Sequence, residues 1–303
     1  MKQKGIIVGF ALMAMMSFIL SSCLSSNYTD PSIAFNEQFK KDTAAINAYV
    51  KLKGLDPIFD VNHIGIVFIN RTNNLPPRAD SEVGITYTGK LLNETVFDSN
   101  NINGPVSGFV QGFSAGLQLM PVGSTAIMLI PSVFAYGSAG KGSIPGNSSL
   151  VFNVTVNNVI KTDDQKTQFV TDTTAIYNYL NTNSITGTIK DASGLRYLIT
   201  KAGTGTPPDL FDRVKIAYTG TLMSNGDQVI NGTGQPAENF DSWVVNYLQA
   251  FQVALKNLGV GGKATIYAPS GMAFGDNPVN TGSTTIPANS VLIFELELQD
   301  IVN

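Results

Sequence analysis

The stretch Ile130–Phe152, "IPSVFAYGSAGKGSIPGNSSLVF", decides how this chain is interpreted, because it occurs a second time in altered form. The second copy, Ala268–Phe294, is "APSGMAFGDNPVNTGSTTIPANSVLIF". Both copies keep Pro-Ser, Ala-aromatic-Gly, Ile-Pro, Asn-Ser and a final Phe in the same order. So specific a pattern, present twice, predicts that the chain builds one kind of site twice.

Other segments repeat around this stretch. "DTAAINAYV" from Asp42 matches "DTTAIYNYL" from Asp172, 130 residues later. "ITYTGKL" from Ile85 matches "IAYTGTL" from Ile216, 131 residues later. A repeat of this length is too long for a solenoid unit and has the size of a whole domain. We therefore expect two domains of the same kind.

The composition fits two globular domains, which we expect at residues 32–159 and 162–302. Of the 303 residues, 43% are hydrophobic and 14% are charged, which argues against general disorder. The net charge of −3 excludes a basic footprint, so nucleic acid is not an expected partner. One Cys and one His leave no cluster for a zinc site and no Ser-His-Asp arrangement in each repeat. We expect no metal and no cofactor, and we expect His63 to be a turn or surface residue.

The first residues have the pattern of an export signal. Lys2 and Lys4 precede an apolar run, Ile6–Leu20, which is followed by small residues and Cys23. The run is short for a membrane span. "LSSC" at the end of the run resembles the lipobox of bacterial lipoproteins, so we expect residues 1–22 to be a signal peptide and Cys23 to carry lipid. The chain would then be anchored in the bacterial cell envelope, at the outer membrane on its periplasmic or surface face. The alternative is an ordinary signal peptide with an incidental Cys.

Apolar spacing predicts a helix at the start of each domain and strands after it. The helix positions that share a face are Phe35, Phe39, Ile46 and Val50 in the first copy, and Phe169, Ile176 and Leu180 in the second. Strand alternation is found at Val83, Ile85 and Tyr87, at Val214, Ile216 and Tyr218, and in the closing runs from Leu150 and Leu292. A short polar segment, Val159–Phe169, joins the copies.

A second helical run, Gly108–Met120, would place Val110, Phe113 and Leu117 against the sheet, and Tyr247–Leu258 would do the same in the second copy. Helices packed on locally paired antiparallel strands define the α+β class.

Together these motifs resemble the FKBP-type peptidyl-prolyl cis-trans isomerase domain, in its tandem lipoprotein form. The matching segments of the first copy are "ITYTGKL", "VFDS", "FVQGFSAGLQLMPVGS", "IPSVFAYG" and "SIPGNSSLVFNV". Those of the second copy are "IAYTGTL", "FQVALKNLGVGGKATIYAPS", "MAFG" and "TIPANSVLIFELEL". The resemblance implies two FKBP-like domains, each an antiparallel sheet curled around one short helix, with a pocket between sheet and helix.

The resemblance also implies a pocket in the first domain. Aromatic walls would come from Tyr87, Phe97, Phe113 and Phe152, a carboxylate from Asp98, a backbone N–H from Val110, an apolar contact from Ile144, and a hydroxyl from Tyr136. Phe113 stands where the family commonly has Trp. The segment "NNINGPVSGFV" is shorter than the family's, so one further wall aromatic would be missing and the pocket more open.

In the second domain the resemblance keeps the apolar groups and loses the polar ones. The corresponding residues are Tyr218, Val229, Leu248, Phe251, Phe274, Ile286 and Phe294. Val229 and Ile230 replace the Phe-Asp pair, and Phe274 has no hydroxyl. A second Phe-Asp pair in "NFDSW" could bring Asp241 to the pocket by another route, which is the less favoured possibility. We expect this domain to be the weaker catalyst or only a binder.

The function implied is isomerisation of X–Pro bonds in unfolded or folding exported polypeptides, mainly by the first domain. No bond is made or broken in this reaction, so it needs no nucleophile, metal or cofactor. The alternative is a chaperone or peptide-binding lipoprotein without useful turnover. A glycan-handling role ranks third, because exposed aromatic platforms would be needed and Trp243 is the chain's single Trp.

Overall fold

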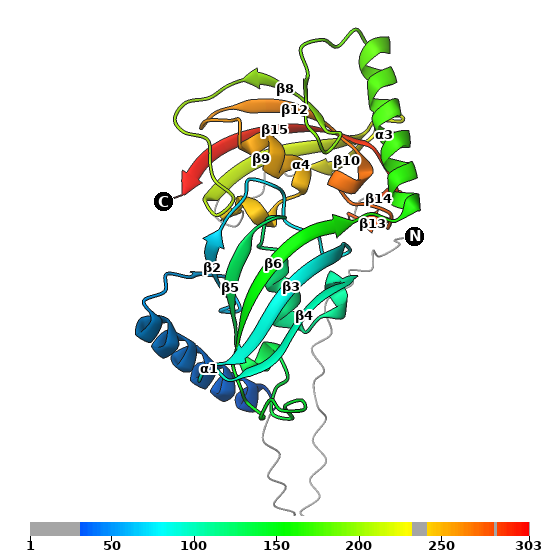
Figure 1. The fold of residues 1–303 in the computed structure, drawn as a ribbon. Helices are drawn as coiled ribbons and strands as arrows, with labels where there is room; N and C mark the ends of the chain where they lie inside the picture. The colour runs from blue at the N-terminus through cyan, green and yellow to red at the C-terminus, as the bar shows by residue number, and fades with distance from the viewer. Residues whose placement is uncertain (1–30, 232–240, 282–283, 303) are drawn as a thin grey trace, which may run out of the picture.

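The computed structural model describes residues 31–231, 241–281 and 284–302, which form two similar α+β units (Figure 1). The predicted signal peptide and Cys23 lie outside the described residues. Within the described ranges, no helix combines the length and the apolar character needed to cross a membrane.

Domain 1 is one antiparallel sheet. A long helix precedes the sheet in the chain, and a short helix lies between its fourth and fifth strands. The sheet has the strand order β1-β2-β5-β6-β3-β4. Its elements are α1 (Pro31–Lys53), β1 (Ile58–Phe59), β2 (Gly65–Asn70), β3 (Glu82–Leu91), β4 (Val96–Pro105), η1 (Val106–Gly108), α2 (Gln111–Leu117), β5 (Thr125–Ile130), η2 (Ser132–Phe134) and β6 (Leu150–Ile160).

Domain 2 repeats this order with small additions. Its main sheet has the order β10-β9-β15-β12-β8-β7, β11 also pairs with β9, and β13 pairs with β14. Its elements are α3 (Asp163–Thr182), β7 (Ile189–Lys190), β8 (Arg196–Lys201), β9 (Arg213–Leu222), β10 (Gln228–Asn231), β11 (Asp241–Trp243), η3 (Val244–Asn246), α4 (Gln249–Leu255), β12 (Lys263–Ala268), η4 (Ser270–Met272), β13 (Val279–Asn280), β14 (Thr285–Ile286) and β15 (Leu292–Val302).

The predicted strand alternation places one face of each sheet in the core. In β6, the side chains of Leu150, Phe152, Val154 and Val156 are at most 5% exposed, as are the corresponding side chains of β15. On the opposite face of the first sheet, Ile46 and Tyr49 of α1 pack with Leu129 and Val151. Ile176 and Leu180 of α3 pack with Tyr267 in the same way. Each sheet is therefore covered on both faces.

The short helices are shorter than their sequence pattern predicts. Val110 precedes α2 with extended backbone angles, and Leu248 precedes α4 likewise, so neither belongs to a helix. The two glycines inside α2 allow close packing: a Cβ on Gly112 would lie 2.3 Å from Ile130, and one on Gly116 would lie 2.4 Å from Met128.

The two domains contact each other directly. Arg78 of domain 1 donates hydrogen bonds to the carbonyls of Ala273 (2.7 Å) and Gly271 (3.2 Å). Gln249 donates to the carbonyl of Pro76 at 2.7 Å. Further contacts are the Arg71–Asp209 ion pair, the Lys256 ammonium on the carbonyl of Asn73, and the rings of Phe68 and Phe211. Because β6 ends at Ile160 and α3 begins at Asp163, most of the predicted linker is strand and helix.

Candidate functional site

Four of the predicted aromatic residues meet between the sheet and α2 in domain 1. Phe113 is the central ring: its centroid lies 4.9 Å from Phe152 and 6.0 Å from Tyr87. Phe97 lies 5.6 Å from Phe152, and the contacts of Phe152 with Tyr87, Phe97 and Phe113 are all edge-to-face. This is the geometry that aromatic rings prefer. We call Tyr87, Phe97, Phe113 and Phe152 the domain 1 cluster.

One ring that the sequence analysis did not include joins this cluster. The ring of Phe109 lies 5.1 Å from that of Phe113. Phe109 precedes Val110 in the extended segment that leads into α2, where helical spacing gave no reason to single it out. It belongs to the short segment, residues 100–110, in which the sequence analysis expected one wall aromatic to be missing.

A bulge in β4 brings Phe97 against β3. Asp98 pairs with Gly89 and Val96 pairs with Lys90, so Phe97 is the extra residue between two pairs. A Cβ on Gly89 would lie 2.6 Å from the Phe97 ring and 2.8 Å from Phe152. Glycine at this position is therefore required for the close approach of both rings.

The carboxylate of Asp98 is bound by the hydroxyl of Tyr87, which donates a hydrogen bond of 2.6 Å. Burial raises the pKa of Tyr87, and the hydrogen bond and negative charge of Asp98 raise it further, to about 12. Tyr136 adds a smaller contribution that raises the pKa of Tyr87 in the same direction. Tyr87 therefore stays protonated and holds Asp98 at the edge of the cluster.

The remaining predicted residues of domain 1 come from the loop after η2 and from the start of α2. Tyr136 is half-buried, and the Lys141 ammonium lies 5.2 Å from its ring centroid. Ile144 is 7% exposed and pairs through its backbone with Lys141. The carbonyl of Val110 accepts a hydrogen bond from the amide of Ser114. Ile144 and Tyr136 both pack against the core that contains the cluster.

Domain 2 has the same aromatic arrangement with fewer members. The Phe251 ring lies 4.9 Å from both Tyr218 and Phe294. We call these three residues the domain 2 cluster. Leu248 and Phe274 pack against the same core, and Val229 and Ile286 are buried within it. Burial raises the pKa of Tyr218, and within the described residues no acidic side chain adds to that shift.

The strand register shows which residue of domain 2 stands at the position of the acid. Ile230 pairs with Gly220 as Asp98 pairs with Gly89, and Val229 is the bulged residue at the position of Phe97. Asp241 pairs with Lys215, five positions along β9 from Gly220. At 3.3 Å per residue, that backbone position is about 16 Å from the acid position. The alternative route for Asp241 has no support from this register.

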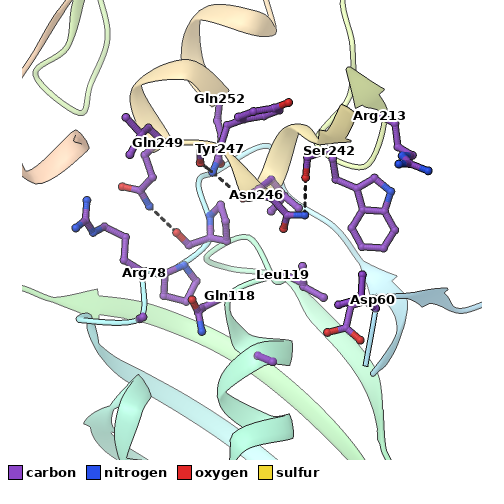
Figure 2. Close-up of a pocket in the computed structure, with 18 of the residues that line it drawn as sticks. Asp60, Arg78, Gln118, Leu119, Arg213, Ser242, Asn246, Tyr247, Gln249 and Gln252 are labelled. Carbon is purple, nitrogen blue, oxygen red and sulfur yellow. Dashed lines mark hydrogen bonds between the residues drawn. The ribbon is translucent and has the colours of Figure 1, made fainter. Parts of the chain in front are cut away.

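A cleft of about 850 Å³ lies between the domains (Figure 2). Most of the residues that line it were not among the predicted site residues. Its domain 1 wall includes Pro76–Ala79 and the end of α2, and its domain 2 wall includes Ser242–Gln249. Leu248 and Phe274, predicted for the domain 2 pocket, also line the cleft. Long-range packing creates this cleft, so no local motif could have predicted it.

Two residues singled out earlier lie at the cleft or next to it. Trp243 lines the cleft, is half-buried, and contacts the Phe211 ring edge-to-face, so it is not an exposed platform. His63 is in a left-handed turn (φ +56°), next to the cleft residue Phe59, whose ring it stacks on at 4.0 Å. The Nε2 of His63 lies 3.1 Å from the amide oxygen of Asn47.

These features define a class: a protein of two α+β domains, each with aromatic rings enclosed between an antiparallel sheet and a short helix. The chain matches the sequence profile of the FKBP-type peptidyl-prolyl cis-trans isomerases at residues 74–157 and again at 205–299, which together exceed half of its length. The chain belongs to this family.

Individual relatives match parts of the chain. An FKBP-type isomerase FkpA from Aeromonas hydrophila is 45% identical over 83 residues, 26% of this chain and 31% of the relative. A 22 kDa FKBP-type isomerase from Escherichia coli is 45% identical over 92 residues, 28% of this chain and 45% of the relative. An outer membrane protein MIP from Legionella longbeachae is 30% identical, over 46% of this chain and 63% of the relative. The chain thus spans less than two thirds of each of these relatives.

Among solved structures, FkpA from Escherichia coli is 26% identical, covers 45% of this chain and 64% of that chain, and has a TM-score of 0.36. A structure of three FKBP domains of wheat FKBP73 is 18% identical, covers 79% of this chain and 94% of that chain, and has a TM-score of 0.34.

Proposed function

We propose that domain 1 catalyses cis–trans isomerisation of X–Pro bonds in polypeptides exported to the cell envelope. The observation that carries the proposal is the meeting of the domain 1 cluster with the Tyr87–Asp98 hydrogen bond at its edge. An apolar, aromatic surface with a few fixed polar groups is the usual form of a ligand site.

The reaction needs a suitable environment more than reactive groups. Rotating an X–Pro amide costs about 18–20 kcal/mol in related amides, because resonance is lost in the twisted state. The twisted amide is less polar than the planar one, so an apolar surface that excludes water stabilises it relative to the ground state. Phe97, Phe113 and Phe152 would provide that surface.

Polar groups would fix the neighbouring peptide units while the amide rotates. The hydroxyl of Tyr136 would donate to a peptide carbonyl, and the backbone N–H of Val110 would do the same from the start of α2. Ile144 would contact the substrate from the loop. Holding both sides of the rotating bond lowers the entropy that must be lost in the transition state.

The test is the isomerisation rate of a proline-containing tetrapeptide, measured with the full chain. Phe97→Asp should reduce kcat/KM at least about tenfold, because a charge in the cluster admits water. Val96→Asp is the matched control: it adds the same charge one residue away on a side chain that is 54% exposed. A rate that Phe97→Asp leaves unchanged would show that the cluster is not the site.

Domain 2 is proposed as a polypeptide binder, and the cleft favours this second role. The cleft shares Leu248 and Phe274 with the predicted domain 2 pocket, so an extended chain held there would continue between the domains. Amide side chains line the cleft at Gln118, Asn246 and Gln249. Their nitrogens donate to Ser114, Ser242 and Pro76, and their oxygens would accept hydrogen bonds from a peptide backbone.

Trp243 allows this binding to be measured, because it is the chain's single Trp and it lines the cleft. A long, uncharged, proline-containing peptide should shift its fluorescence, whereas a tetrapeptide bound in domain 1 should not. Ala79→Phe fills the cleft and should weaken binding of the long peptide. Ala48→Phe, on the exposed face of α1, is the matched control. An unchanged fluorescence at saturating peptide would exclude the cleft.

We also propose that Cys23 is the lipid-bearing first residue of the mature protein. "LSSC" at residues 20–23 supports this, together with the apolar run before it. Stable anchoring needs more than one acyl chain. Mass spectrometry of the mature N-terminus should find acylated Cys23, and an unmodified Cys23 or cleavage at another residue would contradict the proposal.

A further inference from the structure

The first helix of each domain carries one buried carboxylate that binds the loop of Tyr136 in domain 1 or of Phe274 in domain 2. In domain 1, Asp42 of α1 is 2% exposed. Its Oδ2 accepts hydrogen bonds from the hydroxyl of Ser132 (2.7 Å) and from the amide of Val133 (3.2 Å). Its Oδ1 accepts a hydrogen bond of 2.8 Å from the side chain of Gln38.

Domain 2 has the same arrangement, built from a different stretch of chain. Asp172 of α3 is also 2% exposed. Its Oδ2 accepts hydrogen bonds from the hydroxyl (2.6 Å) and the amide (2.8 Å) of Ser270, and its Oδ1 accepts one of 2.7 Å from Gln168. The carboxylate, the serine hydroxyl and the glutamine recur in both copies of the repeat, although the amide donor is Val133 in domain 1 and Ser270 in domain 2. Both carboxylates lie outside the segments that match the family profile.

The serine links the carboxylate to the residue that would act on the substrate. The carbonyl of Ser132 accepts hydrogen bonds from the amides of Ala135 (3.0 Å) and Gly137 (2.9 Å), the two neighbours of Tyr136. In domain 2 the carbonyl of Ser270 accepts from Ala273 and Gly275, the neighbours of Phe274. The side chain of the serine is therefore fixed by the helix while its carbonyl fixes the backbone on both sides of the aromatic residue.

We propose that Asp42 is a positioning residue for isomerisation: through Ser132 it holds the backbone that places the Tyr136 hydroxyl. This inference rests on the proposed function of domain 1. Hydrogen bonds to a carboxylate are stronger than neutral ones, and at 2% exposure Asp42 is shielded from solvent. The helix that precedes the family segment thus becomes part of the catalytic domain.

The experiment measures kcat and KM with the tetrapeptide for the full-length wild type, Asp42→Ala, Asp42→Asn and Ser132→Ala. Asp42→Ala should lower kcat by about threefold or more, and Asp42→Asn should recover part of it because its amide oxygen still accepts hydrogen bonds. Ser132→Ala removes the hydroxyl that binds Asp42 and keeps the backbone carbonyl. It should also lower kcat, and it tests the same link if Asp42→Ala folds poorly. Asp172→Ala removes the same interactions from domain 2 and controls for general loss of stability.

A double-mutant cycle separates positioning from stability. In a Tyr136→Phe background, Asp42→Ala should cost little further rate, because the hydroxyl that it positions is absent, while the loss in melting temperature should be the same in both backgrounds. An equal loss of rate in both backgrounds, or a lowered melting temperature with unchanged kcat, would overturn the proposal.

Hydrogen exchange gives a readout that does not depend on activity. The amides of Ala135 and Gly137 should exchange faster in Asp42→Ala than in the wild type, and exchange at Ala273 and Gly275 should stay the same. Unchanged exchange at Ala135 and Gly137 would exclude Asp42 as the support of this loop. An inactive wild type would contradict the proposed function, and the exchange rates would still decide the role of Asp42.

Discussion

At the scale of single residues, the hydroxyl of Tyr87 and the carboxylate of Asp98 act as one hydrogen-bonded unit at the edge of the domain 1 cluster. The sequence predicted both residues for the site but not that they would bind each other. Domain 2 differs at this position: Ile230 stands where domain 1 has the acid, and burial raises the pKa of Tyr218. The two domains therefore differ in polarity at one position of a shared framework.

The stability of the protein should depend on Tyr87 in alkaline solution. The folded-state pKa of Tyr87 is about 12 against an ordinary value of 10.0, with burial as the largest cause. Folding therefore favours the protonated form. This contribution is complete below pH 10 and should be lost as the pH rises from 10 towards 12.

Urea unfolding at several pH values checks this. The stability difference between the wild type and Tyr87→Phe should shrink above pH 10, and Tyr177→Phe, which removes a hydroxyl from an exposed side chain, should show no such trend. A difference that stays constant through this range would contradict the assigned pKa.

At the scale of elements, the sequence predicted the strands better than the helices. Alternation at Leu150, Phe152 and Val154 was sufficient, because a strand's two faces follow directly from every second residue. Helical spacing at Val110 and Phe113 was not sufficient to predict the start of α2, because Val110 is extended and still fits the helical spacing. The contact of Asp42 with Ser132 joins positions 90 apart in the chain, and no local pattern relates them.

The bulge of β4 makes a prediction about the pair formed by Phe97 and Gly89. Gly89→Ala should displace the Phe97 ring, since the new Cβ would lie 2.6 Å from it. Overpacking of this kind costs about 1–3 kcal/mol of stability, and the isomerisation rate should fall as well. Gly104→Ala, on the neighbouring strand β4, is the control, because its Cβ would meet only the Phe109 ring, at 3.8 Å. Equal kinetics for the two variants would mean that Phe97 tolerates displacement.

At the scale of the whole molecule, domain 1 supports the loop of domain 2. The guanidinium of Arg78 donates to the carbonyls of Gly271 and Ala273, in the loop whose Ser270 donates to Asp172. Asp80 binds the same guanidinium and orients it. The cleft depends on this packing, which is why the sequence of either domain alone could not predict it.

Loss of Arg78 should loosen domain 2 without a direct effect on the domain 1 cluster. In Arg78→Ala, the amides of Ala273 and Gly275 should exchange hydrogen faster, and calorimetry should show the second domain melting earlier. Arg78→Lys should not restore the wild-type behaviour, because a single ammonium lacks the planar donor geometry. Unchanged exchange in Arg78→Ala would show that the interface contributes nothing to the loop.

Asp42 and Asp172 each support the corresponding loop of their own domain, so the two domains share one framework. The site residues of one domain should therefore be transferable to the other. Domain 2 retains the carboxylate, the serine, the bulged strand and three rings, and it lacks one acid, one hydroxyl and the ring of Phe97, whose position Val229 takes. Val229→Phe and Ile230→Asp together with Phe274→Tyr should therefore give domain 2 the site groups of domain 1, detectable as regained turnover in a chain silenced by Phe97→Asp. The protein would then carry a second folded scaffold that three substitutions convert into an active site.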